Sequence, residues 1–505
     1  MAKKEESTLD INALMLDYMN GVMEECEKKE AISSTVDTGY FLSTGLLMYD
    51  MILNGGIRSG WTTSLGKEQS GKTSLAVKIM GSLAKNNIPA YFIDAEGSLN
   101  TEYACAIAGI NSVEEYFGRK SPTGKGYEIL PKIRYTDENG MEKVARFMQR
   151  ILLALPDKKY RQETKKWYYV FDIKNNKADK EKYEKLKFKY DMKLYSATGK
   201  YWCEAPDGKF QVVFLLDSLP GLVPENVGEE VNDKGQAMAA DARAISTAMK
   251  PIRGLLRRKH AVFLPINQLR EKPAVMFGNP EYEPMGNFVK FASDTRCQLD
   301  SRAVPDWFQK GKIDGKEVST FGNEPSVETN GTDMYSYKLI KNIKNKNGVA
   351  YRRGWVRIWN EDGFGKCRGF DDVFDTLEYL EYTKQIKLLK TGGRREISGL
   401  EKFIPQLEGK VVSYIDFKRY ILGKSTNNED LLKQFIDNNN LDLEIKDLPD
   451  IRNICFEQIQ SGEAFDLLLV KETSENSVNE ELDEEFEDLD SDKLETDFDE
   501  DDFEG

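Results

Sequence analysis

The chain of 505 residues is poor in the residue types that most often bind metals, with one histidine, His260, and six cysteines. The cysteines are spread singly, without a C-x-x-C pair, which argues against a disulfide framework and a zinc ribbon. A single histidine also argues against histidine-based catalysis and most histidine metal sites. His260 stands between the basic residues 257–259 and a β-prone run, so we expect a surface residue at a helix end.

Long apolar runs are absent as well. No run of about 18 apolar residues occurs, and the first ten residues, MAKKEESTLD, contain no apolar signal core. We therefore expect neither a membrane span nor secretion, and the scattered cysteines fit a reducing cytoplasm. A chain of this length can bury a large core, which predicts two or more domains.

The net charge of −14 is concentrated at one end of the chain. Residues 472–505 contain 18 Asp or Glu and one Lys, so they carry −17 and leave +3 on all other residues. Such charge density with few apolar residues predicts a disordered acidic tail. Its role is either solubility or an electrostatic one, in which it competes with nucleic acid for the basic body or recruits basic partners.

Residues 66–73, GKEQSGKT, fit the phosphate-binding pattern G-x-x-x-x-G-K-[ST] at every fixed position. A β-prone run precedes them, and apolar residues at helical spacing follow. Phosphate is favoured there because backbone N–H groups and the helix dipole converge at a helix start. We expect Lys72 to reach the β- and γ-phosphates of ATP and the Thr73 hydroxyl to ligate Mg²⁺. The predicted nucleotide-binding residues of this segment are Gly66, Glu68, Gln69, Ser70, Gly71, Lys72, Thr73 and Ser74.

Three further β-prone runs end in polar residues. Residues 91–93 lead into Asp94 and Glu96, residues 212–216 into Asp217, and residues 261–266 into Gln268. Parallel sheets place functional side chains at such carboxyl ends, where Asp217 can hold the hydration shell of Mg²⁺. Strands that alternate with helical segments predict an α/β fold with a mostly parallel central sheet flanked by helices.

From residue 41 to about residue 354 the chain resembles the bacterial RecA recombinase family, and its details resemble phage-encoded members. Residues 41–45, with glycines at 55, 56 and 60, resemble the lead-in to the family's phosphate loop. Residues 92–96, followed by Tyr103, are similar to its catalytic glutamate segment. Residues 266–281, followed by Gly286 and Asn287, resemble its second DNA-binding loop, which a general phosphate-loop ATPase would not share.

The resemblance implies roles in catalysis. Glu96 would orient or deprotonate the attacking water, because phosphoryl transfer mostly needs a positioned nucleophile and compensated charge. Gln268 would sense the γ-phosphate and change the conformation of the loop behind it. Tyr103 would stack on adenine, with Asn100 in the same nucleotide-binding set. A structural carboxylate is the alternative for Glu96.

The resemblance also implies an active site completed by a neighbouring subunit. Lys344 and Lys346 are similar to the pair of lysines that reach the ATP held by the adjacent protomer. A solvated basic turn is the alternative, because Lys338 and Lys341 offer competing alignments. The predicted catalytic residues are Lys72, Glu96, Asp217, Gln268, Lys344 and Lys346.

For DNA, the family uses two loops that line a helical axis, and residues 229–238 and 269–283 occupy their positions. Basic residues there would pair with phosphates, which makes binding salt-dependent and largely blind to sequence. Pro273 and Ala274 depart from the family's Ile-Gly, and Met285 replaces a glycine, which stiffens a turn. The predicted DNA-binding residues are Met238, Arg243, Lys250, Arg270, Lys272, Val275, Met276, Phe277, Gly278, Asn279, Gly286 and Asn287.

The largest departure from the family is an insertion at about residues 157–210, after an expected helix at about 140–155. Between residues 158 and 202 it has 14 Lys or Arg against 6 Asp or Glu, interleaved with aromatics. This mixture offers phosphate contacts and stacking platforms, so an auxiliary nucleic-acid surface is one hypothesis. The other is a small β-rich excursion whose aromatics form its own core.

We expect four parts: a polymerisation segment at 1–38 with an amphipathic helix at 9–25, an ATPase core at 39–370, a C-terminal domain at 371–471, and the tail. The resemblance implies an ATP-dependent recombinase that forms homo-oligomeric filaments on single-stranded DNA and pairs it with double-stranded DNA. Single-strand binding or loader proteins are possible partners, and a phage-infected host is a possible location. A RecA-fold hexameric helicase and a scaffold with a vestigial nucleotide site are the alternatives.

Overall fold

A computed structural model of the chain describes residues 40–110, 112–123, 126–161, 164–187, 193–195, 200–225, 234–271, 281–301, 310–313, 316–319, 335–359, 369–391 and 394–468, together with Met19. The predicted N-terminal helix, most of the second DNA-binding loop and the acidic tail lie outside these residues. Among the described helices, none combines the length and apolarity that a membrane crossing needs.

A nine-stranded sheet forms the centre of the molecule, with the order β21-β20-β19-β16-β3-β13-β12-β4-β7. Six neighbouring strands from β16 to β7 are parallel, and β19, β20 and β21 continue the sheet in antiparallel pairing. The mostly parallel α/β fold predicted from the sequence is thereby confirmed. The strands are β3 (Gly60–Gly66), β4 (Ala90–Asp94), β7 (Ile133–Thr136), β12 (Val213–Asp217), β13 (Val262–Gln268), β16 (Thr295–Asp300), β19 (Tyr335–Asn345), β20 (Arg353–Trp359) and β21 (Gly369–Phe370).

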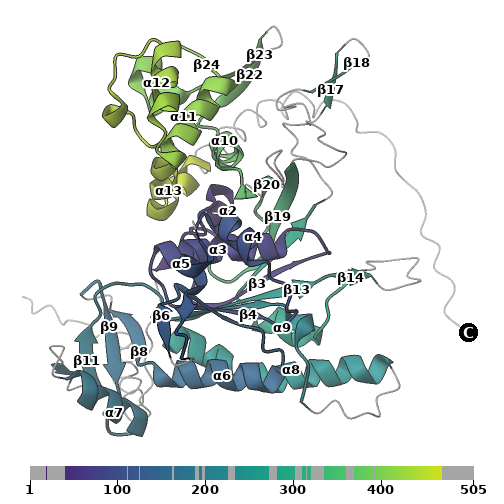
Figure 1. Cartoon of the computed structure of the whole chain (residues 1–505), viewed down its shortest axis with the longest axis vertical. Helices are drawn as coiled ribbons and strands as arrows, with labels where there is room; N and C mark the ends of the chain where they lie inside the picture. The colour runs from purple at the N-terminus through teal and green to yellow at the C-terminus, as the bar shows by residue number, and fades with distance from the viewer. Residues whose placement is uncertain are drawn as a thin grey trace, which may run out of the picture.

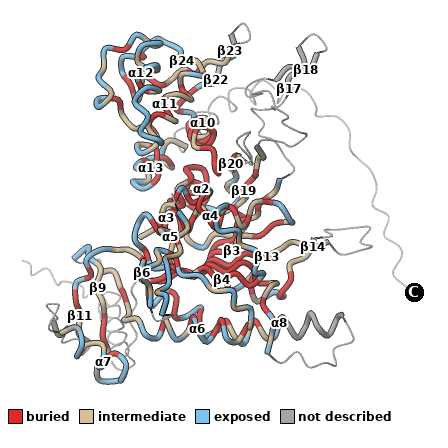
Figure 2. The backbone as a smooth tube through the Cα atoms, viewed as in Figure 1, coloured by how far each residue is buried: buried red, intermediate tan, exposed pale blue. Residues whose placement is uncertain are grey.

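Helices cover both faces of this sheet (Figure 1). On one side lie α3 (Lys72–Lys85), α4 (Thr101–Ala108) and α5 (Val113–Phe117), and on the other α6 (Met141–Ala154), α8 (Lys234–Arg258) and α9 (Gly286–Ala292). Strand β12 shows why both layers are needed: Val213 and Leu215 pack into the first layer, while Phe214 and Leu216 pack into the second. Figure 2 shows the resulting buried centre. A central strand buried on both faces reads as a continuous apolar run, which is how the sequence revealed it.

Helix α6 follows the expected pattern, with Val144, Met148 and Leu152 buried against the sheet. Phe147 lies at the edge of this buried side of α6, where its ring meets the ring of Tyr91 edge-to-face at 5.1 Å.

The insertion forms its own small α/β unit at the end of α6. Its four strands make an antiparallel sheet in the order β10-β11-β9-β8, which confirms the β-rich architecture of one hypothesis. Its aromatics do not all form a core of their own, because Trp167 packs against His260 of the ATPase core. The unit lies to one side of the core, beside α6 (Figure 1). Its elements are β8 (Asp157–Arg161), β9 (Lys166–Phe171), α7 (Lys177–Leu186), β10 (Lys193–Tyr195) and β11 (Lys200–Glu204).

The prediction that His260 is a surface residue is wrong. His260 follows the end of α8 but is fully buried, at 0% exposure. Its ring lies 4.1 Å from the ring of Trp167 of the insertion, and its Nε2 is 2.7 Å from the Gly208 carbonyl oxygen. The rings of Tyr40 and Phe210 pack around it. The insertion covers this helix end, and nothing in the local sequence around His260 announces that contact.

The residues after β21 form a second hydrophobic cluster that also takes in a short helix of the core. This helix, α2 (Leu47–Ile52), contributes Leu47, Met48 and Met51. The Asp375 carboxylate accepts hydrogen bonds from the first backbone N–H groups of α2, at 2.8 and 3.2 Å. Arg452 bonds the same carboxylate at 2.7 Å and the Gly45 carbonyl oxygen at 3.1 Å. The unit is thus fixed to the ATPase core by apolar packing and buried charge.

This C-terminal unit contains α10 (Asp372–Tyr382), β22 (Lys387–Thr391), β23 (Arg394–Ser398), β24 (Val412–Ser413), α11 (Tyr414–Thr426), α12 (Glu429–Asn438) and α13 (Ile451–Ser461). Residues 400–407 contain two 3₁₀ turns, Leu400–Lys402 and Pro405–Leu407. Another 3₁₀ turn is Ile445–Asp447, and Leu219–Gly221 is one in the core. The remaining short strands pair in twos: β1 (Phe41–Leu42) with β2 (Ile57–Arg58), β5 (Arg119–Lys120) with β6 (Tyr127–Ile129), β14 (Arg270–Glu271) with β15 (Glu281–Tyr282), and β17 (Lys310–Ile313) with β18 (Lys316–Ser319).

Candidate active site

The predicted phosphate loop joins the end of β3 to the start of α3, as its flanking pattern requires. Its glycines are needed for steric reasons: a Cβ on Gly66 would lie 2.5 Å from the Leu299 carbonyl oxygen, and Gly71 has a left-handed φ of 89°. Gly71 precedes the first residue of α3, so the backbone N–H groups of the helix start face the loop. The site therefore has the backbone shape and the donors that a phosphate group requires.

Lys72 and Thr73 lie where the sequence predicted them. The Lys72 ammonium donates to the Lys67 carbonyl oxygen at 2.5 Å, folded back over the loop. The Thr73 hydroxyl donates to Asp217 Oδ2 at 2.6 Å, which joins the phosphate loop to the carboxyl end of β12. A hydroxyl beside a carboxylate is an all-oxygen donor set, which suits Mg²⁺.

The charged side chains Asp217 and Lys72 at this edge of the sheet are largely buried. Burial raises the pKa of Asp217 to about 6, Glu96 and Asp94 add to the rise, and the hydrogen bond from Thr73 opposes it. Burial also lowers the pKa of Lys72, against the attraction of Asp217 and Glu96. A cation surrounded by carboxylates and helix donors forms a site that favours a phosphate group together with a divalent cation.

Glu96 lies between two neighbouring strand ends. Its Oε1 accepts hydrogen bonds from the Ser218 hydroxyl, just after β12, and from Gln268 Nε2 at the end of β13, at 3.2 Å. Parallel pairing brings the three strand ends together, since Asp94 of β4 is opposite Asp217 of β12, which in turn neighbours β13. The structure therefore unites Lys72, Thr73, Glu96, Asp217 and Gln268 in one place.

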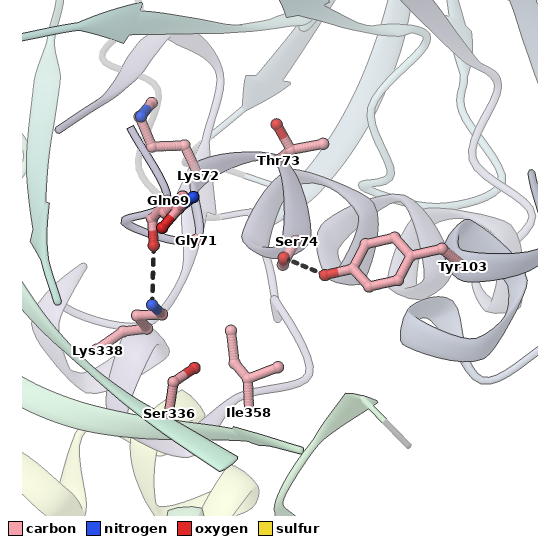
Figure 3. A pocket seen from close by; sticks show the side chains of 9 residues that line it. All are labelled: Gln69, Gly71, Lys72, Thr73, Ser74, Tyr103, Ser336, Lys338 and Ile358. Carbon is pink, nitrogen blue, oxygen red and sulfur yellow. Dashed lines mark hydrogen bonds between the residues drawn. The ribbon is translucent and has the colours of Figure 1, made fainter. Parts of the chain in front are cut away.

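A cavity of roughly 270 Å³ opens beside the helix start (Figure 3). Tyr103 of α4 faces it, and its hydroxyl is hydrogen-bonded to Ser74 Oγ. Asn100 instead caps α4, where its side chain accepts from the Tyr103 N–H at 2.9 Å. The cavity is lined by Gln69, Gly71, Lys72, Thr73, Ser74, Tyr103, Ser336, Lys338 and Ile358. Glu68 and Asn100 are exposed outside this lining, whereas Ser70 is buried within the loop.

Lys344 and Lys346 lie at the opposite end of β19 from the cavity. Lys344 pairs in register with Arg296, which is opposite Thr63, so it lies toward the amino end of β3 rather than near Gly66. Its ammonium donates to the Lys290 carbonyl oxygen at 2.5 Å, while that of Lys346 is 3.6 Å from Asp294. Within one chain these lysines do not share the site of Lys72.

Lys338 and Ser218 are the residues that sequence reasoning did not assign to the site. The Lys338 ammonium donates to the Gln69 carbonyl oxygen of the phosphate loop at 2.8 Å (Figure 3). Ser218 follows Asp217 directly, so its position after a buried strand was the available signal. Lys338 was named only as a competing alignment for the paired lysines, and nothing in the sequence placed it at its own phosphate loop, because β19 reaches the loop only through the pairing of distant strands.

The predicted DNA-binding residues are described in part. Arg243 and Lys250 are exposed on α8, Arg270 on β14, and Asn287 at the start of α9. Met285 takes a left-handed φ of 67° just before α9, a conformation that a glycine would adopt at lower cost. Met238 lies in α8, and Gly286 opens α9. The others lie outside the described residues: Lys272, Val275, Met276, Phe277, Gly278 and Asn279.

Comparisons with known proteins agree with this geometry. The family model described as the RecA N-terminal domain matches residues 18–133 and 207–321, leaving out the segment that contains the insertion. Protein RecA of Streptococcus gordonii is 24% identical over 407 residues, covering 78% of this chain and 80% of the relative. Protein RecA of Aquifex aeolicus is 26% identical over 280 residues, covering 55% and 59%. Protein RecA of Mycoplasma mobile is 24% identical over 387 residues, covering 74% and 84%.

The two matched segments include β3, the phosphate loop, α3, β4 with Glu96, β12 with Asp217 and β13 with Gln268. They meet in space at one edge of the sheet, although 73 residues separate them in the sequence. A RecA N-terminal domain implies ATP binding. The relatives are distant in sequence, at 24–26% identity. The chain thus contains a domain that matches the RecA N-terminal domain on both sides of an insertion, and it is similar to Protein RecA of several bacteria.

Proposed function

We propose that the protein is an ATP-dependent DNA recombinase that forms a filament on single-stranded DNA and catalyses homologous pairing and strand exchange. The contact between Gln268 and Glu96 carries this proposal. Gln268 bonds the proposed catalytic carboxylate and also ends the strand that leads into Arg270 and the segment assigned to DNA. One side chain thus links the hydrolytic site to the DNA-binding loop.

Hydrolysis would follow from the positions of the described side chains. Lys72 and the helix-start N–H groups hold the phosphates, and Thr73 with Asp217 would hold Mg²⁺, whose charge compensates the phosphate oxygens when it is bound. Glu96, fixed by Ser218 and Gln268, orients the attacking water beside them. Positioning and charge compensation account for most of the catalysis in phosphoryl transfer.

Gln268 would act as the switch. When a γ-phosphate competes for its amide, the bond to Glu96 is exchanged for one to the nucleotide, and the end of β13 moves with it. Such exchange biases the loop behind Gln268 between two conformations, because a ligand shifts an equilibrium by its differential affinity for the two states.

The position of Lys344 and Lys346 supports an active site shared between protomers. They are far along β19 from their own phosphate loop, so they would act on the ATP of an adjacent subunit in a helical homo-oligomer. We also propose a cytoplasmic location in a bacterium or phage-infected host, and a phage origin, which the insertion and the departures near residue 273 motivate. Loader and single-strand binding proteins complete the proposed partners.

Electron microscopy on long single-stranded DNA with Mg²⁺ and a non-hydrolysable ATP analogue tests the function. Continuous helical filaments on extended DNA are expected. Discrete rings on unextended DNA would instead establish the hexameric helicase. Irregular binding to DNA that is the same with and without the nucleotide would leave the third alternative, a non-enzymatic DNA-binding scaffold with a vestigial nucleotide site. Bare DNA would contradict all three.

The substitution Gln268→Ala tests the switch, with Ser218→Ala as the matched control. Both remove one hydrogen bond to Glu96, but only Gln268 leads into the DNA segment. We expect Gln268→Ala to abolish the stimulation of ATP hydrolysis by single-stranded DNA, while Ser218→Ala lowers hydrolysis and keeps the stimulation ratio. Equal ratios in the two variants would refute the assigned role of Gln268.

A further inference from the structure

The sheet of the insertion has two chemically different faces. Because antiparallel partners share a face and successive residues alternate, Lys158, Trp167 and Tyr169 lie on one side and Lys159, Tyr168 and Trp202 on the other. The first side, the docking face, lies against the core: Trp167 meets His260, and the Lys158 ammonium donates to the Lys209 carbonyl oxygen at 2.6 Å. The docking face therefore already has its partner within the chain.

The second side, the basic face, combines cations with aromatic rings. The rings of Tyr168 and Trp202 meet edge-to-face at 5.8 Å, and the Arg161 guanidinium lies 5.7 Å from the Trp202 ring centroid. Both rings are partly exposed. The described residues of this face are Asp157, Lys159, Arg161, Lys166, Tyr168, Val170, Lys200, Trp202 and Glu204.

Positive charge prevails on the basic face. Among the residues whose side chains the structure describes, it holds four cations and two carboxylates. Each of these carboxylates is bonded to a lysine: Asp157 to Lys259 at 2.8 Å and Glu204 to Lys166 at 2.7 Å. Lys159 lies within electrostatic range of Lys200 and of Arg258 at the end of α8. Burial lowers the pKa of Lys159, the attraction of Asp157 opposes this fall, and the two cations add to it. Cations held together in this way favour a ligand with repeated negative charge.

The basic face is also remote from β14 and from the amino end of α8, the described elements next to the two predicted DNA loops. The insertion docks at the carboxyl end of α8, where Lys259 bonds Asp157, whereas the first predicted DNA loop precedes the amino end. A helix of 25 residues separates the two ends by roughly 37 Å. Figure 1 shows the insertion and β14 on opposite sides of the core. A strand bound at β14 and at the amino end of α8 would therefore lie on the other side of the core from the basic face.

We propose that the basic face is a second nucleic-acid site, which binds a separate single-stranded segment through its phosphates and stacks unpaired bases on Tyr168 and Trp202. Lys159, Arg161 and Lys200 would pair with phosphates, and the rings would accept bases without regard to sequence. The site lies in a segment that the matched family domain leaves out, so it goes beyond the proposed recombinase function.

Binding of a second strand to preformed filaments tests the site. Full-length protein is assembled on immobilised oligo(dT) with Mg²⁺ and a non-hydrolysable ATP analogue, and the affinity for a labelled second oligo(dT), which cannot pair with the first, is measured against salt. The variant Lys159→Glu, Arg161→Glu, Lys200→Glu is compared with Lys174→Glu, Lys177→Glu, Lys180→Glu. The control makes the same charge change at exposed lysines in and before α7.

We expect the basic-face variant to bind the second strand at least about tenfold more weakly, and its slope of log affinity against log salt to fall by about two for three lost phosphate contacts. The control should behave as wild type. Unchanged affinity and slope, or equal losses in both variants, would overturn the proposal. Filament formation on the first strand is the separate readout of the recombinase function, so the two failures are distinguishable.

A neutral substitution guards against misfolding of the reversed-charge variant. Tyr168→Leu with Trp202→Leu retains apolar side chains while removing the rings, and about a tenfold loss of oligo(dT) affinity is expected. Docking of the insertion is monitored by the fluorescence of Trp167. A loss confined to duplex DNA, with oligo(dT) affinity intact, would overturn the assignment to single strands.

Discussion

The ATPase core and the insertion present polar side chains in two different ways. In the core, the inner parallel strands β12 and β13 are buried on both faces, so the chemistry gathers at their carboxyl ends, as Asp217 and Gln268 show. In the insertion, an antiparallel sheet uses one face to dock and leaves cations and rings on the other. Parallel sheets therefore concentrate a site at an edge, whereas an antiparallel sheet can display one across a face.

The two regions also depend on different stabilising contacts. The site in the core is held by hydrogen bonds that link strand ends with one another and with the start of α3, such as Thr73 to Asp217 at 2.6 Å. The insertion is held by aromatic packing around His260. A substitution in the active site should therefore lower ATP hydrolysis without releasing the insertion, and a substitution in the aromatic contact should release the insertion without lowering hydrolysis.

The largest effect is expected for Lys72→Arg. The larger guanidinium cannot take the place of the ammonium that folds over the loop, so ATP hydrolysis should fall by roughly 10³-fold while the insertion stays docked. Steady-state hydrolysis with single-stranded DNA measures the first effect, and hydrogen exchange of residues 157–204 the second. Full activity of this variant would refute the site.

Next comes Trp167→Ala, which should release the insertion and spare the active site. Loss of the Trp167 ring, which packs against His260, should lower the free energy of unfolding of the insertion by about 3 kcal/mol. This is the lower end for a tryptophan, because the side chain is only partly buried. Faster hydrogen exchange in β8 and β9 with unchanged ATP hydrolysis is expected. Trp202→Ala is the control: its ring lies on the basic face, so docking should survive.

A buried carboxylate of the core gives a pH dependence. Burial raises the pKa of Asp50 from its ordinary 3.8 to about 7, against hydrogen bonds from Ser43 and Thr44. Between these values the folded state holds a proton that the unfolded chain has released, so the free energy of unfolding falls as pH rises, by about 2 kcal/mol from pH 5 to pH 7. Denaturant unfolding at several pH values should show a flatter slope of the free energy of unfolding against pH for Asp50→Asn than for the wild type. An unchanged slope would contradict the assignment.

The smallest effect is expected for Lys338→Ala. The Lys338 ammonium bonds the phosphate loop through Gln69 and lines the cavity, so its loss should weaken nucleotide binding about tenfold. Lys341→Ala on the same strand is the control, because it lies outside the cavity lining. Titration of a fluorescent ATP analogue measures both. Equal affinities in the two variants would exclude Lys338 from the nucleotide site.

Local sequence signals predicted much of the core and its site. The phosphate loop, the strand ends at Glu96, Asp217 and Gln268, and the β-rich character of the insertion could all be inferred from spacing and composition. Each of these features depends on neighbours in the sequence, such as a glycine that permits a left-handed φ or a carboxylate directly after an apolar run.

Features that depend on distant segments could not be inferred. The insertion buries His260, the strand pairing of β19 brings Lys338 to the phosphate loop, and α2 joins the apolar cluster of the C-terminal unit. In each case the partners are far apart in sequence, and only chain folding decides which of many compatible surfaces meet.

The sequence alone determined the α/β class, the phosphate loop and the existence of a basic, aromatic insertion, because backbone sterics and residue periodicity act over a few residues. Only the tertiary structure decided that three strand ends meet around Glu96 and that Lys344 lies far from its own loop. It also decided which face of the insertion remains available. Those outcomes depend on strand order and register, which are set by the packing of the whole core.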